Sequence, residues 1–204
     1  MYLVASTAAR YRHSCMFVSD LRHYLDMPAD VPGPARRMAE RLTLIVRAAT
    51  AGDAGARWVS ALTCDRRPGR QPCPGHLILS RTDIPPSIEW RCTSCGDGGV
   101  ISGWERSPFD LRRRSTEPIP GDALQAVIPP DVAATLRSLL LLDTTAERIV
   151  FRAQRLERGI VLAADKNDLD DLIDSVAAEA NHEHDRRRRK RLDHAFEVLS
   201  QVLE

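Results

Sequence analysis

The segment Arg91-Cys92-Thr93-Ser94-Cys95-Gly96 decides how the middle of this chain folds. Two cysteines separated by two residues aim their thiolates at one point, and the glycine after them permits a tight turn that directs backbone amides toward the sulfurs. Strand-like sequence lies on both sides, with Ile88 and Trp90 alternating with polar residues before the turn. The pattern predicts half of a metal site, held at a turn between two strands.

Two further cysteines can complete a tetrahedral site. Cys64 and Cys73 join Cys92 and Cys95 in the spacing Cys-x8-Cys-x18-Cys-x2-Cys. A second ligand set also fits. His76 follows Cys73 after two intervening residues, the same spacing as between Cys92 and Cys95, and it can replace Cys64. Four protein ligands leave no open position on the ion, so we expect a structural metal, zinc, and no catalytic one. A redox pair or a disulfide fits less well, because no helix start follows Cys92 and no export signal precedes the chain.

Residues 62–104 resemble a zinc ribbon. The resemblance rests on the turn that carries Cys92 and Cys95, called the knuckle, and on a second cysteine pair flanked by proline and glycine. The eight residues between Cys64 and Cys73 depart from the short spacer of a usual ribbon. The resemblance implies a small β module in which the ion links a loop to a hairpin. Only two of the 29 basic residues are lysine, and in this bias the chain resembles uncharacterised proteins of GC-rich, actinobacterial-type bacteria, which implies no function.

The predicted fold class is α+β. Apolar spacing predicts helices near residues 17–25 and from Pro34 to Gly52, within an N-terminal helical region of residues 1–57. The ribbon-like module covers 58–106, with strand-like runs at 58–62, 76–81, 87–91 and 100–104. A proline-rich linker spans 107–121, and residues 122–204 form a β-hairpin with long amphipathic helices.

Two parts of the C-terminal region leave alternatives. Residues 147–164 favour a hairpin, because β-branched and aromatic residues cluster there, but a helix starting at Thr144 also fits. Residues 167–204 contain neither glycine nor proline and form either one long helix or two helices broken near Asn181. We favour a continuous or merely bent helix, because four arginines in the first turn of a new helix would oppose its macrodipole.

Composition excludes several classes of protein. The net charge of +1 does not by itself predict any partner, and no apolar run approaches the ~20 residues of a membrane span. The first residues lack the pattern of a secretory signal, so we expect a cytoplasmic protein. The fifth cysteine, Cys15, is predicted to be a buried small apolar residue.

Three functions remain open. The first is a zinc-stabilised interaction module that acts as a nucleic-acid-binding regulator. Its candidate phosphate contacts lie inside the Cys64–Cys73 loop and in a C-terminal basic run: Arg66, Arg67, Arg70, Arg187, Arg188 and Arg189. The second is a protein-binding adaptor that uses the amphipathic C-terminal helix. The third is an enzyme built around Glu179, His182 and His184, although no phosphate loop or nucleophile motif accompanies them.

Overall fold

The computed structural model describes residues 16–28, 31–114 and 123–203. The architecture is α+β, as the sequence predicts. The elements follow in the order β1 (Met16–Asp20), η1 (Leu21–Tyr24), α1 (Gly33–Ala51), β2 (Arg57–Thr63), η2 (Pro68–Arg70), β3 (His76–Asp83), β4 (Pro86–Cys92), β5 (Gly98–Ser102), η3 (Leu111–Arg114), β6 (Leu124–Ile128), α2 (Pro130–Arg137), α3 (Thr144–Arg152), β7 (Gln154–Leu156), β8 (Gly159–Ala164), α4 (Lys166–His182) and α5 (Arg186–Leu203). Cys15 and residues 115–121 of the predicted linker lie outside the described residues.

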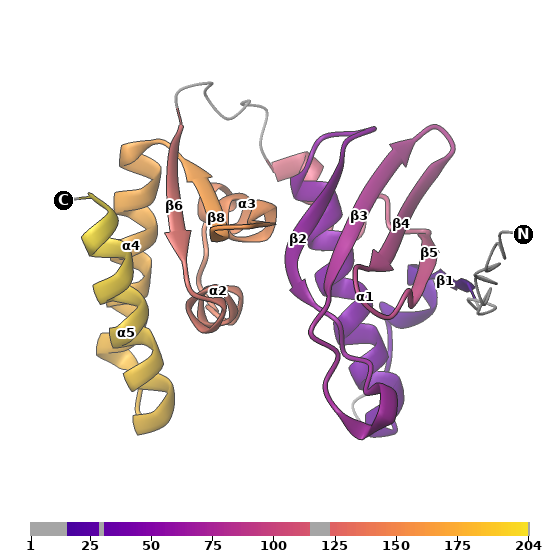
Figure 1. The fold of residues 1–204 in the computed structure, drawn as a ribbon, viewed down its shortest axis with the longest axis horizontal. Coiled ribbons are helices and arrows are strands. Elements are labelled where there is room, and N and C mark those ends of the chain that lie inside the picture. Colours follow the sequence, from indigo (N-terminus) through magenta and orange to yellow (C-terminus); the bar gives the residue numbers. More distant parts are fainter. Residues whose placement is uncertain (1–15, 29–30, 115–122, 204) are drawn as a thin grey trace, which may run out of the picture.

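The described strands form one eight-stranded sheet in the order β1-β5-β4-β3-β2-β7-β8-β6 (Figure 1). The pairing is antiparallel except between β1 and β5, which run parallel. The link between the N-terminal and C-terminal strands is narrow, since β2 pairs with β7 at Ser60 and Gln154. Beside this pair, a backbone hydrogen bond of 3.0 Å from Ala61 N to Ala153 O also joins the two sets of strands. The strands of the ribbon-like segment are thus part of a larger sheet.

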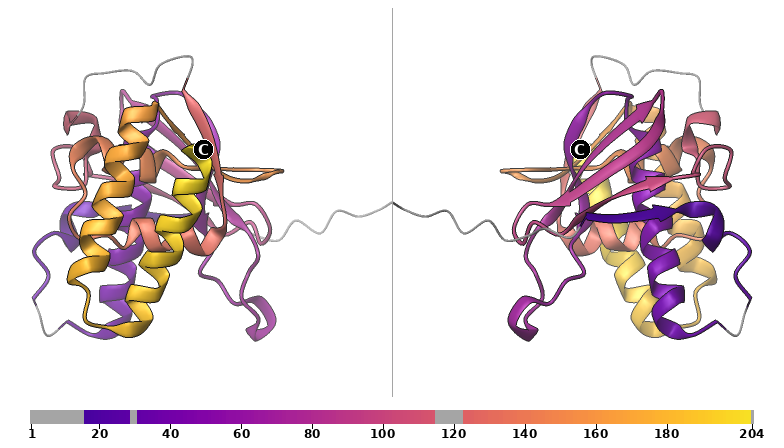
Figure 2. Two further views of the ribbon diagram at one scale, coloured as in Figure 1. Left: turned by 90° about the vertical axis from the view of Figure 1, so that its left-hand side faces the viewer. Right: turned by 90° about the vertical axis from the view of Figure 1, so that its right-hand side faces the viewer.

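Alternating burial explains how α1 covers the N-terminal strands. On β3, Leu77, Leu79 and Arg81 are buried, while the residues between them are half-exposed. The buried side chains meet the apolar face of α1, and one continuous core joins both halves of the chain. Figure 2 shows α1 beside the strands, and α3 of the C-terminal half packs against it. All four strands predicted between residues 58 and 104 are confirmed, as is the helix from Pro34.

The helix predicted near residues 17–25 is wrong. Met16–Asp20 form the edge strand β1, and Leu21–Tyr24 follow as a 3-10 turn in which the Asp20 carboxylate accepts a hydrogen bond from Arg22 N. Pairing with β5 overrides the local periodicity. Gly99 makes this pairing possible, because a Cβ there would lie 2.3 Å from the Phe17 carbonyl oxygen.

Each C-terminal alternative has a definite outcome. Residues 144–152 form the helix α3, capped by Asp143, whose carboxylate accepts from Ala146 N at 2.7 Å. The favoured hairpin is therefore wrong for that stretch, but it does form at 154–164 as β7 and β8. The continuous C-terminal helix is also wrong. The chain breaks at residues 183–185, which lets α5 fold back on α4 and bury Leu192, Ala195 and Leu199.

A buried guanidinium closes the end of α1. Arg81 is 5% exposed, and its Nη1 donates to the carbonyl oxygens of Ala49, Thr50 and Gly52 at 3.0–3.3 Å. These carbonyls lie where the helix ends and would otherwise lack a partner. Arg81 also forms an ion pair with Asp83, 3.1 Å from its Nε.

We predict that Arg81→Met destabilises the protein by about 2–4 kcal/mol, because it leaves several buried carbonyls at the end of α1 without a donor. Urea unfolding followed by circular dichroism measures the change. The control is Arg57→Met, which removes an exposed arginine from β2 and should change stability by less than about 0.5 kcal/mol. Equal stability of the two variants would contradict this role for Arg81.

Candidate metal centre

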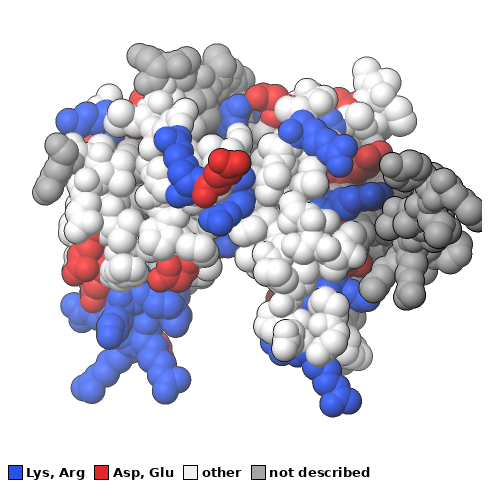
Figure 3. Space-filling view, in the orientation of Figure 1, with Lys and Arg blue, Asp and Glu red and all other residues white. Residues whose placement is uncertain are grey.

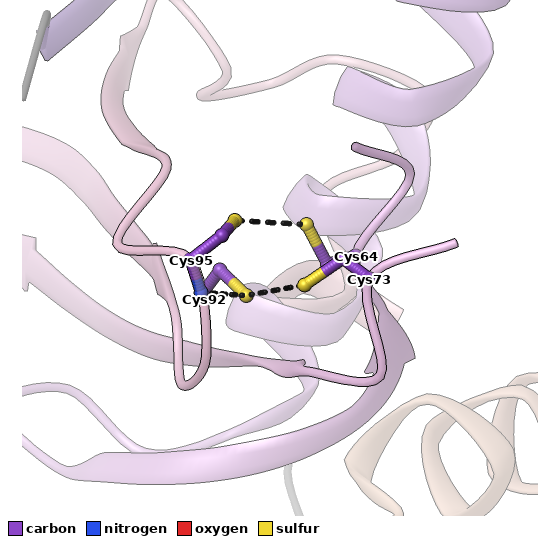
Figure 4. Close-up of side chains that lie close together, drawn as sticks. All are labelled: Cys64, Cys73, Cys92 and Cys95. Atoms are coloured by element: carbon purple, nitrogen blue, oxygen red, sulfur yellow. Dashed lines mark hydrogen bonds between the residues drawn. The ribbon is translucent and has the colours of Figure 1, made fainter. Parts of the chain in front are cut away.

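Four cysteines converge at one end of the N-terminal strands (Figure 4). Cys64 follows β2, and Cys73 lies in the loop that leads to β3. Cys92 ends β4, and Cys95 lies in the turn that follows. Their sulfur atoms all lie within 4.8 Å of one another, so the four residues can hold a metal ion.

The sulfur separations match a tetrahedral cage. Cys64 Sγ lies 3.7 Å from Cys95 Sγ, and Cys73 Sγ lies 3.6 Å from Cys92 Sγ. Four sulfurs bound at ~2.3 Å to a central ion would be ~3.8 Å apart, whereas a disulfide requires ~2.05 Å. The four side chains are free thiols, of which Cys95 is the most exposed. The geometry favours metal coordination over a disulfide pair.

Backbone hydrogen bonds hold three of the cysteines in place. Cys64 N donates to Gly75 O at 2.8 Å, Cys73 N to Arg66 O at 2.9 Å, and Cys92 N to Asp97 O at 2.7 Å. Gly75 has a second role, because a Cβ at this position would lie 2.4 Å from Cys92 Sγ. The sequence offers Gly75 only as part of Cys-Pro-Gly-His, and only the packing shows that it makes room for a sulfur.

The knuckle amides favour ionisation of one thiol. Ser94 N and Cys95 N point at Cys92 Sγ at 3.3 and 3.4 Å. Burial opposes the charge, but the amide hydrogen bonds outweigh it and lower the pKa of Cys92 to about 7. Burial raises the pKa of Cys64. A bound cation would complete the ionisation of the set, since coordinated thiols lose their protons.

His76 does not join this group of ligand atoms. Its backbone instead braces the knuckle, because His76 N donates to Thr93 Oγ1 at 3.0 Å and Thr93 N donates to His76 O at 2.9 Å. Burial lowers the pKa of its imidazole, and the nearby Arg155 and Arg137 lower it further. Of the two ligand sets that the sequence allows, the structure brings together the one with four cysteines.

The arginines predicted to contact phosphates differ in their surroundings. Arg66, Arg67 and Arg70 are all exposed on the loop between Cys64 and Cys73. This loop turns through Gly69 and Arg70, which both have positive φ, of 63° and 68°. Arg66 Nε lies 3.9 Å from an Asp97 carboxylate oxygen, so one of the three side chains faces an acid.

The polar cluster of residues 179–185 is organised around Arg188. Its guanidinium donates to Glu179, lies 3.2 Å from a Glu183 oxygen and donates to Ser138 O at 3.0 Å. The Glu179 carboxylate also accepts from Leu140 N at 2.9 Å. Arg188 and Glu179 therefore fasten the α4–α5 turn to the segment between α2 and α3. His182 and His184 are exposed beside this ion pair, and they do not converge with it on a metal-binding group.

No family model matches the chain, and neither curated proteins nor solved structures give a significant match. None of the helices in the described residues is long and apolar enough to cross a membrane. The candidate functions therefore rest on the geometry of the chain itself.

We predict that Cys64→Ser lowers affinity for a tetrahedral metal ion by several orders of magnitude, whereas His76→Ala changes it by less than about tenfold, because four thiolates bind such ions more tightly than three. Competition with a chromophoric chelator measures the affinity for Zn²⁺, and the visible spectrum of the Co²⁺ form reports tetrahedral thiolate coordination. Strong loss in His76→Ala with retention in Cys64→Ser would move the site to the other ligand set.

Proposed function

We propose that this protein is a zinc-stabilised module that binds nucleic acid through phosphate contacts. The observation that carries the proposal is the placement of two exposed basic groups, one on the loop between Cys64 and Cys73 and one at the start of α5. Figure 3 shows basic side chains gathered at the lower end of the molecule, below α5 and below the loop between β2 and β3. A phosphate backbone is an extended anion that can meet both groups.

Zinc is the ion that suits this site best. Soft thiolate ligands in tetrahedral geometry select zinc over magnesium or calcium, which prefer oxygen ligands. With four protein ligands the ion would have no open position, so its role is to link Cys64 and Cys73 to the knuckle of β4. The ion thereby holds the arginine loop in one conformation, which reduces the entropy lost when that loop binds a partner.

The start of α5 is electrostatically unfavourable by itself. Arg186, Arg187, Arg189, Lys190 and Arg191 are exposed, and the first turn contains no acid. The helix macrodipole places partial positive charge at the same end, so the basic side chains repel it. Both acids of the turn that leads into the helix contact Arg188: Glu183 lies 3.2 Å from its guanidinium, and the Asp185 carboxylate accepts from Arg188 N at 2.7 Å. A bound phosphate would relieve this repulsion, since anions bind well at helix N-termini.

One predicted contact, Arg188, and one helix, α3, do not belong to the proposed surface. Arg188 points inward to Glu179 and Glu183, so the contacts at this helix come from its neighbours. The helix pair α2 and α3 precedes a hairpin, an order also used to place a helix in a DNA groove. Here, however, α3 packs against α1, α2 and α4 and buries Ile149, Val150 and Phe151. The exposed arginines, and not α3, are the proposed contacts.

Protein binding is a second candidate, on a different surface from the one that the sequence suggests. The apolar residues of α5 at 192, 195 and 199 are buried within the chain. Leu140 and Leu141, in contrast, are 75% and 82% exposed and border a hollow of about 480 Å³ on α4. Glu179 and Glu183 border this hollow but pair with Arg188, so the exposed Asp171 and Asp174 of the same helix are the acids left to attract a basic, apolar peptide.

We predict that replacing Arg66, Arg67 and Arg70 by alanine weakens binding to labelled duplex and single-stranded oligonucleotides and flattens its salt dependence. Each phosphate contact removed should lower the slope of log K against log salt by roughly 0.9 for duplex DNA. Fluorescence anisotropy over a salt series measures the slope. Replacing Arg186, Arg187 and Arg189 tests the helix in the same way.

The matched control removes equal charge from other exposed positions, as Arg57, Arg106 and Arg158 to alanine. It should leave the slope close to that of the parent protein. An equal loss in the control would mean that binding follows overall charge alone. Absence of binding at low salt to both DNA and RNA would refute the proposal and favour the peptide surface on α4.

A further inference from the structure

A small cavity lies behind the end of β2, where the two halves of the chain meet. Its volume is about 90 Å³, and it is partly open to solvent. It lies next to the cysteine site, since Asp65 and Thr63 on either side of Cys64 both line it. The remaining lining residues come from α1, β2, β3 and the end of α2: Arg41, Leu44, Ile45, Leu62, Leu77 and Arg137.

Arg137 enters this cavity without a counter-ion. Its Nη1 is buried with no hydrogen-bond partner, and no ion pair with an acid is found for this guanidinium among the described residues. Burial lowers its pKa to about 10, with no acidic neighbour to oppose the shift, so the side chain stays charged at neutral pH. An uncompensated buried charge is costly, and proteins rarely retain one without a partner.

Arg41 brings a second guanidinium to the same cavity. Its Nη1 pairs with Asp65, and its plane stacks on the Trp90 ring at 5.0 Å from the centroid. These contacts fix its orientation, while its Nη2 is buried without a hydrogen-bond partner. Two arginines and one aspartate leave the cavity with a net positive charge. N–H donors without a hydrogen-bond partner, from α1 and α2, therefore line one hollow whose other walls are largely apolar.

We propose that Arg41 and Arg137 form a binding site for a small tetrahedral oxyanion of the phosphate class. A phosphate offers several acceptor oxygens at once, and arginine donates to such groups through paired N–H bonds. The cavity has room for an ion of this size but not for a nucleoside. The bound anion would join α1 to the end of α2 and so couple the two halves of the chain.

This site is independent of the exposed arginines of the proposed function, since neither the loop at 66–70 nor the start of α5 lines the cavity. The same phosphate chemistry can come from free inorganic phosphate or from the terminal phosphate of an oligonucleotide. Each source can be tested separately, because only the second would depend on the loop and helix arginines as well.

The test uses the full-length, metal-loaded protein and inorganic phosphate, with titration calorimetry and thermal unfolding at constant pH and ionic strength in chloride. We expect phosphate to bind and to raise the melting temperature of the parent protein. Arg137→Met should weaken phosphate binding by at least about tenfold, the size expected for the loss of charge-assisted hydrogen bonds. Without phosphate this variant should be at least as stable as the parent, because methionine removes the uncompensated charge.

Further variants make the result decisive. Arg41→Lys keeps a charge but loses the forked donors, and should also weaken phosphate binding. The control Arg57→Met, and the triple alanine variant of Arg66, Arg67 and Arg70, should bind phosphate like the parent. Binding of a short oligonucleotide with and without a 5′-phosphate identifies the source of the phosphate. If the parent protein prefers the 5′-phosphorylated form and Arg137→Met does not, the site binds terminal phosphates. If the parent protein shows no such preference, the site binds the free ion.

Two outcomes would overturn the proposal. One is the absence of any phosphate effect on the parent beyond that of chloride at equal ionic strength. The other is lower metal affinity in Arg137→Met with unchanged phosphate binding, which would make the tetrathiolate centre the counter-charge of Arg137. Neither outcome bears on oligonucleotide binding by the exposed arginines, so this proposal and the proposed function can fail separately.

Discussion

The convergence of four thiols at the ends of β2 and β4 is the constraint on which the N-terminal half depends. Residues 64–75 form a loop without an apolar core of its own, whose turn at 66–72 is exposed throughout, and it stays close to the sheet where Cys64 and Cys73 meet Cys92 and Cys95. Backbone hydrogen bonds from Cys64 to Gly75 and from Cys73 to Arg66 shape this loop, and they do not depend on a bound ion. A cation at the centre would add strong bonds to contacts that already exist, which is how a structural metal stabilises a fold.

The two halves of the molecule share one core but meet through few backbone bonds. The link between β2 and β7 consists of one bridge and a neighbouring hydrogen bond, so side chains supply most of the contact. Arg47 illustrates this, because it extends from α1 to pair with the buried Glu147 and lies 4.6 Å from the centroid of the Phe151 ring on α3. The cavity between Arg41 and Arg137 lies at the same junction. A ligand in this cavity would bind at the junction where the contact between the two halves depends on side chains.

Arginine performs different physical tasks in this protein, although codon bias alone would explain its abundance. Arg81 completes the hydrogen bonds at the end of α1, and Arg112 lies over Trp104 while it pairs with Asp110 and Asp83. Arg188 fastens the α4–α5 turn. These side chains are buried or half-buried and paired with acids or carbonyls. The arginines of the 66–70 loop and of the start of α5 are exposed, and most have no acid beside them, which distinguishes binding candidates from structural ones.

The sequence by itself determined the α+β class, four strands between residues 57 and 102, the helix after Pro34 and the four cysteines that converge as a candidate metal site, because cysteine spacing and side-chain alternation are local properties. It favoured Cys64 but left His76 as an alternative ligand, since ligand choice depends on which side chains the fold brings together. It failed at β1, where pairing with distant Gly99 outweighs helical spacing, and at residues 183–185, where burial of both apolar stripes requires a turn. The pairing of Arg188 with Glu179 and the absence of an acidic partner for Arg137 among the described residues were decided only by the tertiary structure, because the turn between α4 and α5 and the packing of α2 determine which charges become neighbours.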